Sequence, residues 1–204
     1  MKEIGLLPLQ MVLLPHERLP LHIFEDRYKE LVGECIDDVR PFGMLMVEEP
    51  GMRDIGTIAE IDSLQKRFPD GRMNIVVRGL GRFRLVERTS GRSFHTAKIV
   101  RLPDRPDMPD IAQVDSLLEA LADLARAADA DTPTIDTSGP DLAFRLAASV
   151  ELDNHARQDI LELDSELERT QRLTMILREF VGRIGRETET QGRAQTNGRV
   201  DPHR

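Results

Sequence analysis

Apolar residues follow two different spacings along the chain, and the change from one to the other falls near residue 103. Before it, short runs rich in large and β-branched apolar side chains predict β-strands. These runs cover residues 6–12, 42–47, 55–65, 73–78, 82–86 and 94–101. Within residues 57–64 apolar and polar side chains alternate, which is typical of a sheet with one face in water.

One amphipathic helix interrupts these strands. After Asp26, apolar residues recur every three or four positions as far as Val39, and Pro41 ends the pattern. Cys35 belongs to this apolar stripe, so we expect it to be a buried, unreactive residue. The segment 69–72, Pro-Asp-Gly-Arg, predicts the turn of a hairpin, and Gly79 and Gly81 predict a further bend between strands.

Beyond residue 110 the apolar spacing is helical. Stripes of this period predict helices at 111–124, at 142–150, in a short segment that Asp153 caps, and in a long segment after 165. Ser165 and Glu168 match a capping box, which marks the start of the long helix. Between the two parts, three prolines at a spacing of three predict an extended linker over 104–110.

The net charge also differs between the parts of the chain before and after residue 103. The 204 residues carry a net charge of −8, of which residues 1–103 contribute +1 and residues 104–187 contribute −10. An acidic balance argues against nucleic acid as a partner, because affinity for phosphates is largely cationic in origin. The sequence has no apolar run long enough to cross a membrane and no signal peptide. With a single cysteine, these features predict a cytoplasmic protein.

The usual signatures of catalysis and cofactor binding are missing from the sequence. It contains no phosphate-binding loop and no Gly-x-Ser-x-Gly elbow. His16 and His22 are six residues apart on irregular backbone, which does not suit a zinc site, and His95 stands alone on a strand. We therefore expect no cofactor, no metal and no catalytic residue.

Several short motifs, in a fixed order, resemble one known family. The segment 7–28 contains Leu-Pro-Leu, then Val-Leu-Leu-Pro, then Leu-Pro-Leu-His-Ile-Phe-Glu-Asp-Arg-Tyr. The later segments 55–61, 69–72, 77–85, 157–162 and 167–169 follow in the family's order. Together they resemble the N-terminal domain of Lon proteases, and in particular its stand-alone bacterial branch, over residues 5–182.

The resemblance implies an α+β fold, with a PUA-like β pseudo-barrel that holds one helix, followed by a C-terminal α-helical bundle. On this view residues 1–103 form the PUA-like β domain, 104–110 the linker, and 111–185 the helical domain. Residues 186–204 are polar and are expected to form a disordered tail. The ATPase and Ser-Lys protease modules of full-length Lon are not expected in this chain.

The resemblance also implies a function, which is the recognition of unfolded or tagged polypeptides without catalysis. The protein would then be a quality-control adaptor, with a protease or chaperone component as a further partner. The alternative is a small-molecule sensor with a pocket at the seam between the two domains. The family motifs offer Phe24, Glu25, Arg27, Tyr28, Arg82 and Phe83 as candidate binding residues, although structural roles explain each of them more simply. The oligomeric state stays open.

Overall fold

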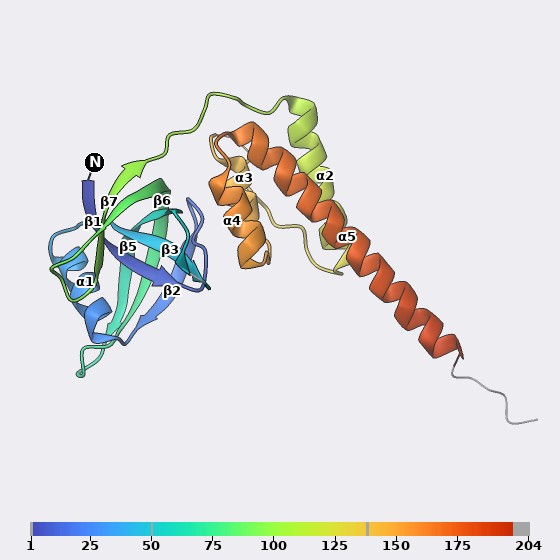
Figure 1. The fold of residues 1–204 in the computed structure, drawn as a ribbon. Coiled ribbons are helices and arrows are strands. Elements are labelled where there is room, and N and C mark those ends of the chain that lie inside the picture. The colour runs from blue at the N-terminus through green and yellow to red at the C-terminus, as the bar shows by residue number, and fades with distance from the viewer. Residues whose placement is uncertain (1, 50, 138, 198–204) are drawn as a thin grey trace, which may run out of the picture.

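Strands make up most of the first 101 residues of the computed structural model (Figure 1), which describes residues 2–49, 51–137 and 139–197, the last eleven as backbone alone. The strands are β1 (Lys2–Leu9), β2 (Arg18–Ile23), β3 (Phe42–Glu48), β4 (Gly51–Met52), β5 (Ile55–Arg67), β6 (Met73–Thr89) and β7 (His95–Arg101). Their order in the sheet is β1-β7-β6-β5-β3-β4, and β2 pairs with β6. Because β1 also pairs in parallel with β3, the strands β1, β7, β6, β5 and β3 form a closed circuit of pairings.

Two apolar clusters fill this half of the molecule. One lies on a single face of the circuit and consists of Ile4, Leu6, Leu45, Ile58, Phe83, Ala97 and Ile99. The other includes Tyr28, Leu31, Val32 and Cys35 of α1 (Asp26–Asp37), which pack with residues such as Phe42, Ile75 and Val77 of the strands. The expected burial of Cys35 on the apolar face of this helix is thus confirmed.

Four helices follow, and they share a core with part of the strand half. They are α2 (Ile111–Ala127), α3 (Leu142–Ala148), α4 (Asn154–Glu162) and α5 (Glu166–Asn197). Their buried apolar residues form one cluster that also contains Val12, Leu14 and Met46. The strand half and the helical half are therefore joined by apolar packing as well as by the chain.

The segment that joins the two halves is bonded to the start of α5. The amide of Arg105 donates to the carbonyl of Asp164 at 2.8 Å, and the amide of Leu167 donates to the carbonyl of Asp107 at 3.1 Å. Backbone groups of this segment thus pair with the chain that opens α5.

The mixture of strands and helices agrees with the sequence, but several strand expectations were wrong. The first strand covers residues 2–9 instead of 6–12, and the short strand β4 was not expected. The segments 73–78 and 82–86 belong to one strand, β6, and Gly79 and Gly81 lie at a register shift inside it instead of at a bend between strands. Strand β2 was not anticipated, because Pro20 interrupts it and proline lacks the amide that a ladder needs. Proline is accommodated here because, among the described strands, β2 pairs on one side alone.

The last helix is longer than its apolar stripe suggests. Helix α5 continues to Asn197, so residues 186–197 are helical where the sequence analysis expected disorder. These residues include helix-favouring Arg, Glu, Gln and Ala and no proline, which accounts for the continuation. The rest of the expected tail, 198–204, lies outside the described residues. None of the described helices is long and apolar enough to cross a membrane.

Candidate functional site

A buried arginine from β6 forms the centre of the seam between the strands and the helices. Arg82 is only 4% exposed. Its guanidinium donates to the carbonyls of Leu161 (3.2 Å) and Leu163 (2.6 Å), which lie at the end of α4, and to the carboxylate of Asp104 (2.7 Å). A cation placed there satisfies carbonyl groups that the end of a helix leaves without partners.

A second buried arginine, Arg169 of α5, continues this network. It donates to the Leu163 carbonyl at 3.1 Å and to the Glu166 carboxylate at 3.0 Å, and it also pairs with Asp104. Its guanidinium lies over the ring of Phe144, 4.2 Å from the ring centre. Asp104 therefore joins Arg82 to Arg169, and so joins β6 to α5.

Glu166 is the buried carboxylate of the network. It accepts a hydrogen bond of 2.7 Å from the amide of Ala143, at the start of α3. Burial raises the pKa of Glu166, while the Ala143 amide and Arg169 act in the opposite direction. The charged form is thus held in place by two partners but destabilised by its loss of water.

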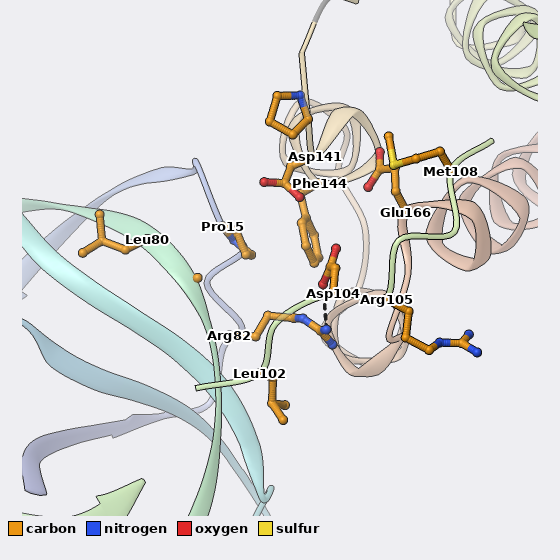
Figure 2. Close-up of a pocket in the computed structure, with 12 residues that line it drawn as sticks. Pro15, Leu80, Arg82, Leu102, Asp104, Arg105, Met108, Asp141, Phe144 and Glu166 are labelled. Carbon is orange, nitrogen blue, oxygen red and sulfur yellow. Dashed lines mark hydrogen bonds and ion pairs between the residues drawn. The ribbon is translucent and has the colours of Figure 1, made fainter. Parts of the chain in front are cut away.

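Above this network lies a cavity of about 330 Å³ (Figure 2). Pro15 and Leu80 line it from the strand half, and Phe144 and Met108 line it from the helical half and the connecting segment. Leu80 is 39% exposed and Met108 is 61% exposed, so both have apolar area that a ligand could cover. The site thus combines a charged, hydrogen-bonded floor with two exposed apolar side chains, Leu80 and Met108, an arrangement that suits non-covalent binding.

Three carboxylates of the site come close enough to hold a metal ion. One oxygen from each of Asp104, Asp141 and Glu166 lies within 4.8 Å of the others. The guanidinium of Arg169 already contacts all three, with Asp141 at 3.7 Å. A positive charge therefore already occupies the space between them, and the donor set does not fit a metal ion as it stands.

The residues considered for nucleophilic or metal chemistry lie in separate places. Burial raises the pKa of the Cys35 thiol to about 11, so at neutral pH it is protonated and a poor nucleophile. His16 contacts Asp141 at 2.9 Å, whereas His22 contacts the side chain of Asn74 at 2.6 Å. His95 is 3.4 Å from Arg27. None of the three histidines contacts another.

Four of the six candidate binding residues gather at the start of α1, away from the seam cavity. Glu25 occupies the N-cap position of the helix and forms an ion pair of 2.7 Å with Arg27. The Arg27 guanidinium lies 4.5 Å from the centre of the Tyr28 ring, which is buried. Phe24 is exposed and stacks with His22, their ring centres 6.1 Å apart.

The other two candidates, Arg82 and Phe83, are neighbours in β6 that point to opposite faces. Phe83 is fully buried in the cluster inside the circuit of strands. Arg82 alone of the six lines the seam cavity. The sequence reasoning did not single out its partners Asp104, Glu166 and Arg169, because they are distant in sequence and carry no motif. The spacing of Glu166 and Arg169, three residues apart on a helix, was the one local signal available.

Comparison with known proteins points to the same family that the sequence motifs resemble. The model of the ATP-dependent protease La (LON) substrate-binding domain matches residues 3–179. A Lon protease of Paraburkholderia phytofirmans is 28% identical over 220 aligned positions, which cover 96% of this chain and 26% of the protease. Protein cereblon of Xenopus tropicalis is 30% identical over 123 residues, 56% of this chain and 28% of cereblon. The chain thus spans about a quarter of these relatives.

Two solved structures have a similar fold. A Lon N-terminal domain protein from Xanthomonas campestris superposes with a TM-score of 0.66 and 24% identity, covering 85% of this chain and 97% of that one. The N-terminal domain of a Mycobacterium avium complex Lon protease gives a TM-score of 0.67 and 18% identity, covering 89% and 98%.

Proposed function

Since the chain belongs to the family of the Lon substrate-binding domain, we propose that it is a polypeptide-recognition module that binds unfolded or tagged proteins without changing them chemically. The matched domain is the non-catalytic, substrate-binding part of Lon. A role as a quality-control adaptor, which passes bound protein to a protease or chaperone component, is part of the proposal.

We also propose that residues 1–103 and 111–185 act as two domains, a PUA-like pseudo-barrel and a helical bundle, with 104–110 as the connection. The closed circuit of strands and the shared core of the four helices support this division.

The observation that carries the binding proposal is the pair of exposed apolar side chains at the seam cavity, Leu80 and Met108. An unfolded segment with large apolar residues would bury them and lie against Phe144 and Pro15. Burial of apolar area is the main source of affinity for such segments, and a single pocket of this size predicts binding in the micromolar range. Of the six motif candidates, Arg82 alone would then support the binding surface.

The test is a binding titration with a permanently unfolded protein, reduced and carboxymethylated α-lactalbumin, followed by fluorescence anisotropy. Leu80→Asp and Met108→Asp are each expected to raise the Kd about tenfold, since each places a charge where apolar contact is needed. Val86→Asp is the matched control, because Val86 is as exposed and also lies in β6 but does not line the cavity. Failure of the unfolded protein to bind, or equal effects of all three changes, would contradict the proposal.

The small-molecule alternative is favoured by the same cavity, whose floor carries hydrogen-bonded charges of both signs. A compound that filled it would stabilise the folded state by mass action. A thermal-shift screen in which a compound raises the Tm of the wild type but not of Leu80→Asp would support a sensor.

A further inference from the structure

A second cavity, at one end of the circuit of strands, differs from the seam in its charge. It has a volume of about 290 Å³ and lies where β1 begins and β7 ends. Its walls are apolar and include Ile4, Ile58, Ile99 and Pro41. Two cationic residues, Lys2 and Arg101, complete the lining, and no carboxylate is among the described residues that line it.

The strand register explains why both cations lie at this end of the cavity. Side chains at alternate positions of a strand share a face, so Lys2 lies on the same face of β1 as Ile4 and Leu6. Arg101 lies on the same face of β7 as Ile99 and Ala97 by the same rule. Lys2 pairs with Ile99 across the two strands, and Arg101 pairs with Phe83 of β6.

These apolar neighbours all belong to the cluster inside the circuit of strands. Lys2 and Arg101 are therefore the next positions along the same inner face, at the point where the cluster meets water. Figure 1 shows the beginning of β1 beside the end of β7 at this edge of the strand half.

Both cations are available to a ligand. Neither Lys2 nor Arg101 makes a side-chain hydrogen bond or ion pair with any other part of the chain that the structure describes. Lys2 also lines a neighbouring cavity, and the two acidic residues of that lining, Glu3 and Glu34, are already engaged. Glu3 accepts a hydrogen bond from Thr89, and Glu34 pairs with Arg92 and Arg40.

We propose that this cavity binds the C-terminal end of a polypeptide, with the α-carboxylate between Lys2 and Arg101 and the last apolar side chain against Ile4, Ile58 and Ile99. This inference rests on the proposed function, because it names the part of a client protein that is recognised. A chain terminus is the place in an unfolded polypeptide where a carboxylate is attached directly to a residue that can be apolar. Capture of a terminal carboxylate is an established mode of peptide recognition.

The size and charge of the cavity fit this occupant. Its volume is at the lower end of the roughly 300–1,000 Å³ range of small-molecule pockets, so it takes about one or two terminal residues. The strand half that holds this cavity has a net charge of +1, whereas residues 104–187 carry −10, so an anion is repelled less on this side of the molecule. Two cations and no carboxylate among the described lining residues favour a negatively charged end group in this cavity.

The test compares two peptides that differ in one group. Both are decapeptides labelled with fluorescein at the N-terminus and ending in Ala-Leu-Val, one with a free carboxylate and one with a carboxamide. The full-length protein carries its purification tag at the C-terminal end, so that β1 is unmodified. Fluorescence anisotropy is expected to give a Kd about tenfold lower for the free carboxylate, with a preference that shrinks as salt is added.

Variants locate the effect. Lys2→Gln and Arg101→Gln are each expected to reduce the preference several-fold, and the double variant is expected to abolish it without weakening the carboxamide peptide. Lys66→Gln is the matched control, because Lys66 is an exposed cation without an ion pair to the described residues and lies on β5, outside this lining. Unchanged circular dichroism spectra confirm that each variant folds.

Four results would overturn the inference. The first is equal affinity for both peptides, and the second is absence of binding by either peptide. In both cases the proposed function would still stand if unfolded α-lactalbumin binds and if that binding depends on Leu80 and Met108. A preference that survives in the double variant would also overturn it. So would binding of free isovalerate as tight as that of the peptide, since the cavity would then take a small carboxylic acid.

Discussion

Arg82 shows how much a single buried side chain contributes to the seam. Its guanidinium satisfies two carbonyls at the end of α4 and pairs with Asp104, while its backbone belongs to the central strand β6. A buried polar group that loses its partner keeps the full cost of its removal from water. Among the described side chains, the carbonyl of Leu161 is bonded by Arg82, whereas the carbonyl of Leu163 is shared by Arg82 and Arg169.

We expect Arg82→Met to lower the free energy of unfolding by about 3 kcal/mol. The apolar side chain removes the donor to the Leu161 carbonyl and one of the two arginines that bond the Leu163 carbonyl and Asp104. Arg84→Met is the control, since Arg84 is exposed in the same strand and makes no side-chain ion pair with the described residues, and its effect should stay within about 0.5 kcal/mol. Urea unfolding followed by circular dichroism measures both. Equal stability of the two variants would show that the seam network contributes little.

Glu166 makes the stability depend on pH in an unusual direction. Because burial raises its pKa in the folded state, the folded protein holds this proton more tightly than the unfolded chain does. Its contribution to the free energy of unfolding therefore falls as pH rises from about 4.3, the ordinary value, through the raised pKa.

The stability difference between the wild type and Glu166→Gln should accordingly decrease across this window and become constant above it. Urea titrations at a series of pH values from 4 to 8 measure that difference. Glu179→Gln, at an exposed position of α5, should show no such trend. A difference for Glu166→Gln that does not change with pH would contradict the assignment.

At the residue scale, the sequence was informative where neighbours in the chain act together and uninformative where they do not. Glu25, Arg27 and Tyr28 interact within one turn, and their local roles could be anticipated. Arg82 was one of the motif candidates, but the carbonyls that it bonds belong to residues 161 and 163, which are distant in the sequence. Asp104 looked like part of a linker, because the two arginines that it joins come together only in the folded protein.

At the scale of elements, the two glycines of β6 differ in what surrounds them. A Cβ atom on Gly79 would lie 2.2 Å from the carbonyl oxygen of Leu14, which is backbone and cannot rotate away. The backbone of Gly79 also exchanges hydrogen bonds with His16 and Glu17. A Cβ atom on Gly81 would meet no described atom within 4 Å.

We therefore expect Gly79→Ala to lower the free energy of unfolding by about 2 kcal/mol, since the loop before β2 must move away from β6. Gly81→Ala should change it by less than about 1 kcal/mol, in either direction. Thermal unfolding of the pair measures the contrast. Unchanged stability of the Gly79→Ala variant would mean that the contact between this loop and β6 does not contribute to stability.

The helices were easier to anticipate than the strand pairings. Apolar stripes and capping residues are local signals, and Ser165 indeed accepts a hydrogen bond from the amide of Glu168 at the start of α5. Strand partners are set by contacts between distant segments. Proline and paired glycines are usually read as breaks in a strand, but in β2 and β6 they lie at an open edge and at a register shift.

At the scale of the whole molecule, the two halves share a core and should unfold together. Val12, Leu14 and Met46 pack with the helices, and Arg157 of α4 donates to the Val12 carbonyl at 3.1 Å and pairs with Glu17. Removing either half would expose this shared surface. Cooperative unfolding is the usual result when one core spans two parts of a chain.

The composition supplies a probe for each half. Tyr28 is the one tyrosine and the sequence has no tryptophan, so its fluorescence reports on the strand half. Circular dichroism at 222 nm reports mainly on the four helices of the other half. We expect the two signals to change at the same urea concentration. Loss of the helical signal well before the tyrosine signal would show that the helical half unfolds independently.

The hydrogen bonds between the connecting segment and the start of α5 have a consequence for protein engineering. Because Arg105 and Asp107 are bonded to the start of α5, the part of the chain that contains α2, α3 and α4 has its two ends held together. Lengthening a flexible loop costs only about 0.6 kcal/mol for each doubling of its length. The exposed, irregular stretch between Asp131 and Thr134 lies in the loop between α2 and α3. A reporter peptide inserted there would lengthen the loop without separating the seam, which would make this stretch a suitable place to label the protein while its binding surfaces stay intact.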